Sequence, residues 1–307
     1  SRDPIKDFDF IAFTLQYELS YTNVLNMLDL AGLPVLAAER TDDMPVVIAG
    51  GPCTVNPEPL ADFIDLFNIG EGEETLLQLV DLWQECGGNK KLFLEKADRL
   101  ESCYVPAIHD RSKKVRRRII KDLDKAPYPE KLIVPNTKVI HDRISMEIMR
   151  GCIRGCRFCQ AGMIYRPFRQ KSPEVMMENI KKLCQSTGYD EISLTSLSSS
   201  DYEKLPEFAD LLLDYCTPKK INLALPSLRI DNFSEELFKK LRAVRSSGLT
   251  FAPEAGTQRL RDAINKNITE EDIFESCRIA FNGGTSSVKL YFMIGLPTET
   301  DEDILGI

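Results

Sequence analysis

Continuous apolar runs alternate with amphipathic segments along the first hundred residues of the chain. Residues 8–15, 45–51 and 64–69 are runs of apolar and β-branched residues, which are typical of buried parallel strands. Residues 21–31 and 74–84 follow the first and third runs and carry apolar positions at helical spacing. The alternation predicts an α/β domain over residues 1–100, a truncated Rossmann-like doubly wound parallel sheet that the chain enters part-way.

Glycines close the second and third predicted strands. Gly50 and Gly51 end the second run, and Gly70 and Gly72 follow the third. Ligands of doubly wound sheets bind beyond the carboxyl ends of the strands, so these four glycines are candidate contacts of a cofactor. Tight turns would require glycine there without any ligand, and the sequence leaves both roles open.

The periodic pattern is lost between residues 101 and 141. This stretch contains four prolines and mixed charges, and it shows neither a helical nor an alternating period. We therefore expect an extended connector over residues 101–141, between two domains.

A second, regular alternation begins near residue 142. Strands are predicted at 144–149, 191–197, 221–225, 249–252 and 287–295, and helices at 172–185, 205–215, 234–244 and in two short pieces within 257–280. This order predicts a partial (βα) barrel over residues 142–307, with its chemistry at the carboxyl ends of the strands. We expect the natural protein to continue beyond Ile307, because the chain stops inside the helix that would follow the fifth strand.

Composition indicates a globular protein of the cytoplasm. The 307 residues are 43% hydrophobic and 28% charged, without a membrane-spanning run or the apolar core of a signal peptide. Nine cysteines, six of them scattered singly, fit a reducing compartment. The net charge of −8 argues against a general nucleic-acid binder, although basic runs at residues 113–121 and around Cys156 leave a structured RNA substrate open.

Three cysteines lie within eight residues, directly after the first strand of the second half. Cys152, Cys156 and Cys159 form a CxxxCxxC motif, and the aromatic Phe158 precedes the last of them. Three thiolates are one short of a closed tetrahedral zinc site. Three ligands to a [4Fe-4S] cluster, in contrast, leave one iron free to bind another group.

Zinc binding and thiol redox chemistry account for the cysteine motif less well. A zinc site would need a fourth ligand, for which His141 and Cys184 are the candidates, but neither has the short paired spacing of zinc ribbons or fingers. A thioredoxin-like redox pair of Cys156 and Cys159 would leave Cys152 without a role.

The motif resembles the signature of the radical S-adenosylmethionine (SAM) enzymes. CxxxCxxC with an aromatic residue before the third cysteine is their pattern, and HDRISMEIMRGC followed by CRFCQAGMIYRPFR is similar to the subgroup with a cobalamin-binding-like domain in front. The resemblance implies that the three cysteines hold a [4Fe-4S] cluster and that SAM chelates the free iron. A low-potential electron donor of the flavodoxin or ferredoxin type would then yield a 5'-deoxyadenosyl radical.

For the first domain, the resemblance implies a cobalamin-binding fold whose loops face the corrin. Cobalamin is therefore a candidate second cofactor, with the four glycines after the second and third strands as its contacts. The DxHxxG element, whose histidine ligates cobalt in many cobalamin domains, is absent, and the only histidines are His109 and His141.

The resemblance also points to the strand ends of the second domain as contacts of SAM. The positions where the family often has Gly-Gly-Glu carry hydroxyls here, and the next two strand ends read PSLR and FAPEAG. Arg229 would pair with the methionine carboxylate, and Glu254 would accept from ribose hydroxyls or from the substrate. Arg259 and Arg261 are expected on an exposed helix surface. The candidate cofactor contacts are Phe158, Thr195, Ser196, Ser227, Arg229, Glu254, Gly256 and Met293.

The reaction that follows radical formation is not readable from these residues. With cobalamin bound, we expect methyl transfer to an unreactive carbon of an unknown substrate, RNA or protein; without it, hydrogen abstraction or methylthio transfer stays open. A methylthiotransferase acting on tRNA or a ribosomal protein would need a second cluster, for which Cys53, Cys86 and Cys103 are dispersed candidates. The alternative from another class is a non-catalytic iron-sulfur or zinc module.

Overall fold

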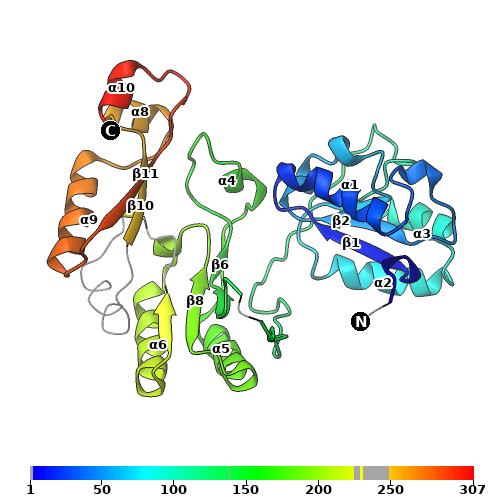
Figure 1. The fold of residues 1–307 in the computed structure, drawn as a ribbon, viewed down its shortest axis with the longest axis horizontal. Coiled ribbons are helices and arrows are strands. Elements are labelled where there is room, and N and C mark those ends of the chain that lie inside the picture. Colours follow the sequence, from blue (N-terminus) through cyan, green and yellow to red (C-terminus); the bar gives the residue numbers. More distant parts are fainter. Residues whose placement is uncertain (1–2, 138, 225–228, 231–248) are drawn as a thin grey trace. The chain divides into compact units, whose positions relative to one another are not determined.

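The chain divides into two compact units, Ser1–Lys121 and Asp122–Ile307 (Figure 1). The computed structural model describes residues 3–137, 139–224, 229–230 and 249–307. The expected connector is shared between the units, because residues 101–121 belong to the first unit and residues 122–141 to the second. The division into domains at 1–100, 101–141 and 142–307 stays a prediction.

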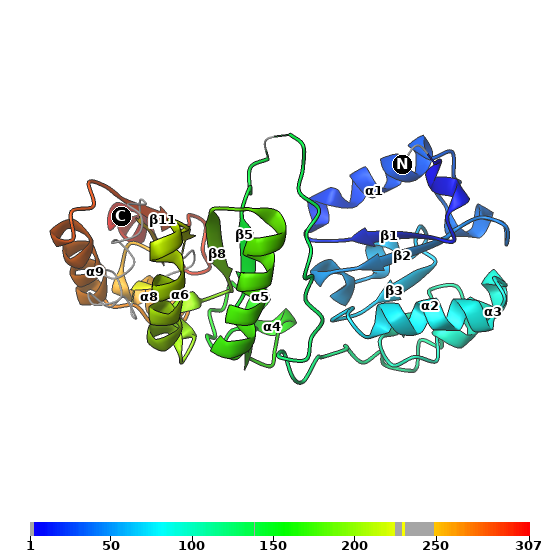
Figure 2. The ribbon, with the colours of Figure 1, turned by 90° about the horizontal axis from the view of Figure 1, so that it is seen from below.

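The first unit is a doubly wound sheet, as its sequence predicts. Within residues 3–121, the strands lie in the order β1-β2-β3-β4, the first three are parallel, and β4 is antiparallel to β3. These strands are β1 (Phe10–Thr14), β2 (Val46–Gly50), β3 (Leu66–Asn68) and β4 (Cys103–Tyr104). Helix α1 covers one face of the sheet, and α2 and α3 cover the other (Figure 2). The helices are α1 (Tyr21–Leu30), α2 (Thr75–Glu85) and α3 (Lys90–Ala97).

Successive residues of these strands enter two different cores. Val47 packs in the cluster that contains Leu28 of α1, whereas Val46 packs with Phe93 of α3. Both faces of the sheet are therefore buried, which is why its strands appear in the sequence as continuous apolar runs.

The second unit contains two parallel sheets. In the part that the structure describes, a three-stranded sheet has the order β5-β8-β9, and β10 pairs with β11. Their bounds are β5 (Ile144–Glu147), β8 (Glu191–Thr195), β9 (Asn222–Ala224), β10 (Leu249–Glu254) and β11 (Val288–Phe292). The five expected strands are confirmed, and within these residues they do not close into a barrel. The helix expected at 234–244 lies outside the described residues.

Helices α5 and α6 lie beside the three-stranded sheet (Figure 2). Met176 of α5 and Phe208 of α6 pack in one core with Met146 of β5 and Ile192 of β8. The helices of this unit are α4 (Ala161–Ile164), α5 (Pro173–Thr187), α6 (Leu205–Lys219), α8 (Gln258–Ala263), α9 (Glu270–Asn282) and α10 (Asp301–Leu305). None of the helices described here or in the first unit is long and apolar enough to cross a membrane.

A short antiparallel pair brackets the cysteine motif. β6 (Met149–Arg150) leads into it, and β7 (Arg169–Gln170) pairs with β6 on the way out. Gly151 has φ +89°, and a Cβ there would lie 2.7 Å from the carbonyl oxygens of Tyr165 and Pro167. Only glycine fits this crossing, so the chain can leave the sheet, form a loop and return beside its starting point.

Candidate functional site

The three cysteines of the motif lie on one loop after β5 and β6, which we call the cysteine loop (residues 151–160). Cys152, Cys156 and Cys159 are each partly exposed, and none forms a disulfide. The backbone N–H of Arg154 donates to the Cys152 sulfur at 3.4 Å, and the N–H of Cys159 donates to the carbonyl of Cys156 at 3.1 Å. Three accessible thiols on one loop are the donor set that a cluster with one open iron requires.

Burial keeps five cysteines outside the motif as neutral thiols. Burial raises the pKa of Cys53, Cys184 and Cys277, and it raises the pKa of Cys103 to about 12 and that of Cys216 to about 11. Because the thiolate is the metal ligand, these side chains are poor donors at neutral pH.

The two candidates for a fourth zinc ligand, His141 and Cys184, do not form a metal-binding group with the motif. Across the described ranges, no three His, Cys, Asp or Glu side chains lie in an arrangement that could hold a metal ion. His141 contacts Arg143 through Nδ1 at 3.0 Å, and Cys184 packs against the core of the second unit. The three motif cysteines do not form such a group either, so binding a cluster requires the loop to bring their sulfur atoms together.

The cysteines considered for a second cluster are also apart. Cys53 packs in the core on the α1 side of the first sheet, whereas Cys86 and Cys103 pack in the core on its other side. The sheet itself separates these thiols, and this disfavours the second cluster that a methylthiotransferase would carry.

Arginines around the cysteine loop bind groups of the protein itself. Arg154 donates from Nε to Asp201 at 2.9 Å and makes an ion pair with it through Nη2. Arg150 binds Glu147 through two hydrogen bonds of 3.0 and 2.9 Å. Arg157 donates from Nη1 to the carbonyl of Ala263 at 2.6 Å. Arg154 and Arg157 therefore hold the cysteine loop to its surroundings, whereas Arg150 joins the strands before it.

Asp201 is kept ionised in this network. Its side chain is buried, which by itself raises the pKa. The hydrogen bond from Arg154 and the charges of Arg154 and Arg229 outweigh burial, so the pKa of Asp201 lies below its ordinary value. The carboxylate thus links the cysteine loop to the turn that follows β8.

Predicted cofactor residues from separate segments meet around Lys266. Lys266 Nζ forms an ion pair with Glu254 at 3.1 Å and lies 5.8 Å from the centre of the Phe158 ring. Arg229 donates from Nη2 to the carbonyl of Lys266 at 3.2 Å, and its backbone N–H donates to Ser200 Oγ at 2.8 Å. Phe158, Arg229 and Glu254 are therefore neighbours, joined by a lysine that sequence analysis missed.

The hydroxyl residues after β8 lie on the segment that contacts the cysteine loop. Thr195 is exposed at the end of β8, and its carbonyl accepts from the N–H of Ile148 at 3.1 Å. Ser196 Oγ lies 2.8 Å from Ser199 Oγ, in the turn that leads to Asp201. Ser227, the other predicted hydroxyl contact, lies outside the described residues.

Gly256 and Met293 differ in their relation to the site. The N–H of Met293 donates to the carbonyl of Glu254 at 2.8 Å, which places this residue beside a predicted ribose contact. A Cβ at Gly256 would lie 2.4 Å from the carbonyl oxygen of Asp303 and 2.6 Å from the nitrogen of Ile307. The close approach at Gly256 is therefore made by α10 and the residues after it.

Two family models match the chain, one in each half. The model described as the radical SAM superfamily matches residues 146–307, more than half of the chain, and the model described as the N-terminal part of radical SAM proteins matches residues 1–106. The chain belongs to the radical SAM superfamily. Enzymes of this superfamily use a [4Fe-4S] cluster and SAM, which agrees with the donor set of the cysteine loop.

Relatives of this radical SAM chain are longer than the chain itself. The uncharacterized protein MJ0966 of Methanocaldococcus jannaschii is 34% identical over 305 residues, which are 98% of this chain and 62% of that protein. The chain thus spans less than two thirds of the length of this relative.

Solved structures of two cobalamin-dependent or methyl-transferring radical enzymes share the fold. The cobalamin-dependent SAM radical enzyme OxsB, with aqua-cobalamin and SAM bound, matches with a TM-score of 0.68 and 16% identity over 97% of this chain and 42% of its own. The radical SAM methyltransferase TsrM of Kitasatospora setae matches with a TM-score of 0.68 and 14% identity over 96% and 58%. At these identities the likeness establishes the fold alone.

In the N-terminal unit of the radical SAM chain, backbone packing explains two of the four predicted cofactor glycines. Gly51 has φ +97°, and a Cβ there would lie 2.7 Å from the carbonyl oxygen of Leu15. Gly70 has φ +106°, and its Cβ would lie 2.4 Å from the carbonyl oxygen of Arg118. Gly50 has no such neighbour within 4 Å. Their role as cofactor contacts stays a prediction.

The basic run at 113–121 packs beside the loop after β3. The N–H of Arg118 donates to the carbonyl of Ile69 at 2.9 Å, the N–H of Glu71 donates back to the carbonyl of Arg118 at 3.1 Å, and Arg118 pairs with Glu74. Gly72 lies in this loop, where its Cβ would meet only the Asn68 amide at 3.6 Å. The end of β3 is therefore partly covered by the protein's own chain.

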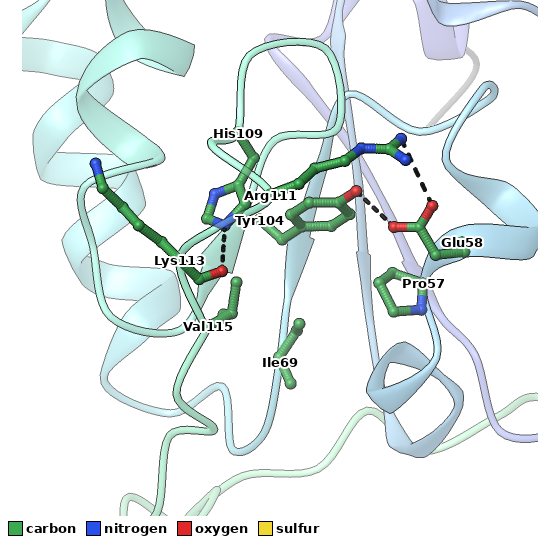
Figure 3. Close-up of a pocket in the computed structure, with 8 residues that line it drawn as sticks. All are labelled: Pro57, Glu58, Ile69, Tyr104, His109, Arg111, Lys113 and Val115. Atoms are coloured by element: carbon green, nitrogen blue, oxygen red, sulfur yellow. Dashed lines mark hydrogen bonds and ion pairs between the residues drawn. The ribbon is translucent and has the colours of Figure 1, made fainter.

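A pocket of about 260 Å³ opens next to this loop (Figure 3). Glu58 on its rim accepts from the Tyr104 hydroxyl at 2.7 Å and pairs with Arg111 at 3.7 Å. His109 is held through Nδ1 by Asp98 at 2.7 Å and lies 3.3 Å through Nε2 from the carbonyl of Lys113. The pocket is smaller than the roughly 300–1,000 Å³ of drug-sized ligand sites, and its histidine is bound at both nitrogens. The pocket is therefore too small for a corrin ring, and His109 is not available to ligate cobalt. Its lining consists of Pro57, Glu58, Ile69, Tyr104, His109, Arg111, Lys113 and Val115.

Proposed function

We propose that this chain binds the cluster and SAM in a radical SAM enzyme. The observation that carries the proposal is the set of three partly exposed cysteines, free of disulfides, on the loop that follows β5 and β6 in the second unit, within the residues that the family model matches. Cys152, Cys156 and Cys159 would hold the [4Fe-4S] cluster. When bound and reduced by a flavodoxin- or ferredoxin-type donor, the cluster supplies the electron that cleaves SAM into methionine and a 5'-deoxyadenosyl radical.

The residues around Lys266 would bind SAM. The guanidinium of Arg229 would pair with the methionine carboxylate. Glu254 would accept from ribose hydroxyls, with Lys266 holding its carboxylate in place at 3.1 Å. Phe158 would provide a wall between the cluster and the nucleoside. The remaining proposed contacts are Thr195, Ser196, Ser227, Gly256 and Met293.

Replacement of one motif cysteine tests this function. Cys156→Ala should abolish both the visible absorbance of the reconstituted cluster and the formation of 5'-deoxyadenosine from SAM with dithionite as reductant, because three thiolates are needed to hold the cube. Cys277→Ala is the matched control and should leave both signals unchanged, since Cys277 lies on α9 and is not part of the motif.

Retention of the cluster and of deoxyadenosine formation by Cys156→Ala would refute the proposal. A wild-type chain that binds the cluster but forms no deoxyadenosine would instead support a non-catalytic iron-sulfur module. Iron analysis separates a further alternative, because one [4Fe-4S] cluster requires about four iron atoms per chain and a methylthiotransferase with two clusters about eight.

We further propose cobalamin as a second cofactor and methylation of an unknown RNA or protein substrate. The support is the fold, which the chain shares with a cobalamin-dependent radical enzyme and with a radical SAM methyltransferase. The N-terminal unit offers no free histidine for cobalt within residues 3–121, so a bound corrin would be held without one.

Corrin absorbance tests the second cofactor. After incubation with hydroxocobalamin and gel filtration, the folded chain should retain about one corrin, with a spectrum in which no histidine ligates cobalt, and the urea-unfolded chain should retain none. A folded chain that also elutes without corrin would contradict cobalamin binding and leave hydrogen abstraction or methylthio transfer as the reaction class.

A further inference from the structure

We propose that the turn after α8 is a latch for the cysteine loop, with Asn265 as its positioning residue. The latch consists of residues 263–266, and it acts on the protein before any cluster is bound. The proposal rests on the proposed function of the cysteine loop, but its contacts and its test concern the free protein.

Three hydrogen bonds join the latch to the middle of the cysteine loop. Asn265 donates from Nδ2 to the carbonyl of Gly155 at 2.8 Å. Arg157 donates from its backbone N–H to the carbonyl of Ile264 at 2.9 Å and from Nη1 to the carbonyl of Ala263 at 2.6 Å. These bonds hold the residues on both sides of Cys156. The latch and the cysteine loop are more than a hundred positions apart in the sequence.

The end of α8 explains why asparagine occupies position 265. The N–H of Asn265 donates to the carbonyl of Asp262 at 3.0 Å, and that of Lys266 donates to the carbonyl of Arg261 at 2.9 Å, which is the hydrogen-bond pattern of a Schellman cap. The residue in the left-handed conformation of such a cap is usually glycine, and Asn265 has φ +54°. Asparagine tolerates this conformation and adds the amide that reaches Gly155.

The opposite side of the contact is shaped for the same amide. A Cβ at Gly155 would lie 3.1 Å from Asn265 Nδ2, closer than a side chain and an amide normally approach. The missing side chain at Gly155 therefore lets the carboxamide reach the carbonyl at hydrogen-bond distance. The two residues complement each other from distant parts of the sequence.

Buried hydrogen bonds hold the base of the latch in place. Arg261 is 3% exposed and donates to the carbonyls of Ile268 and Ala255, both at 3.0 Å. Lys266 continues the connection, because its side chain lies over Phe158 and pairs with Glu254. A loop held on such a base has less conformational freedom to lose when its three thiols converge on iron.

Asn265→Gly separates the latch from the helix cap. Glycine suits the left-handed position at least as well, so the helix should keep its end, whereas the bond to Gly155 is lost. In the reduced, cluster-free whole chain, we expect Cys156 and Cys159 to react with iodoacetamide about five- to tenfold faster than in the wild type, as measured by mass spectrometry of the cysteine peptides. This factor corresponds to the loss of one hydrogen bond.

Asn267→Gly is the matched control. Asn267 also has a positive φ, of +53°, and is exposed two residues further along, where no contact with the cysteine loop is described. Its alkylation rates should equal those of the wild type. Asn265→Asp provides a second variant, because aspartate tolerates the same conformation and lacks the donor, and it should react as fast as Asn265→Gly.

Equal alkylation rates in wild type, Asn265→Gly and Asn265→Asp would overturn the latch. An equal acceleration by Asn267→Gly would overturn it as well, since the effect would then come from glycine in the turn. Faster alkylation in a chain that binds no iron would support the latch while the proposed function fails, so the two ideas are tested separately.

Discussion

Arg154 and Asp201 show how a single buried charge can position the candidate site. Asp201 follows β8, and its partner lies in the cysteine loop between Cys152 and Cys156. The side chain of Asp201 is 2% exposed and that of Arg154 is 22% exposed. Removal of one partner from such a pair leaves the other charge buried without compensation, which is usually more costly than the pair is stabilising.

Asp201→Asn should destabilise the second unit by about 1–3 kcal/mol at neutral pH, because a charge-assisted hydrogen bond is lost. The pKa of Asp201 is lower in the folded chain than its ordinary value, so the stabilisation is present above about pH 4 and is lost as pH falls through the folded pKa. The difference between variant and wild type should therefore shrink in acid. Urea unfolding followed by far-UV circular dichroism at several pH values measures it.

Trp83 provides the internal control for this variant. It is the single tryptophan of the chain and packs against Phe10 and Phe93 in the first unit. Its fluorescence transition should not change in Asp201→Asn. A pH-independent loss of stability would contradict the assignment of the effect to the carboxylate.

At the scale of elements, the end of β2 shows how packing of a strand against its neighbour sets the sequence. β1 and β2 pair in parallel, and the chain turns at Gly50 and Gly51 directly over the backbone of Leu15. One of these glycines is required by geometry and the other is not. Substitution of each glycine therefore tests which of the two the turn requires for stability.

Gly51→Ala should destabilise the first unit by about 2 kcal/mol or more, because alanine is strained at φ +97° and its Cβ meets backbone atoms of Leu15. Gly50→Ala should be neutral or slightly stabilising, since space is open there and alanine loses less entropy on folding than glycine. Urea unfolding followed by Trp83 fluorescence measures both variants. Equal stability of the two variants would show that the turn tolerates a side chain.

At the scale of the whole molecule, each unit is organised around its own core and matched by its own family model. The cysteine loop, its arginine partners and the residues around Lys266 all belong to the second unit. The glycine loops and the pocket of Figure 3 belong to the first. The contacts that bear on cluster and SAM binding therefore lie within one unit, and the proposal of cobalamin concerns the other.

Much of the architecture could be predicted because buried strands and amphipathic helices leave local patterns. The strands of the first sheet were expected at 8–15, 45–51 and 64–69 and are found within those ranges. Strand β4 was missed because two residues carry no period. The prediction that Arg261 lies on an exposed helix surface is wrong. This side chain is buried, and its guanidinium donates to the carbonyls of Ile268 and Ala255.

The sequence by itself determined the features that are patterns of near neighbours. These are the spacing of Cys152, Cys156 and Cys159, the alternation of strands and helices, and the start of α5 at Ser172 and Pro173. Only the tertiary structure placed Asn265 against Gly155 and Lys266 between Phe158 and Glu254. Such contacts join residues up to 110 positions apart, and they produce no periodic pattern of residues that could be recognised in a single sequence. They depend on how strands, turns and helix ends pack together in space.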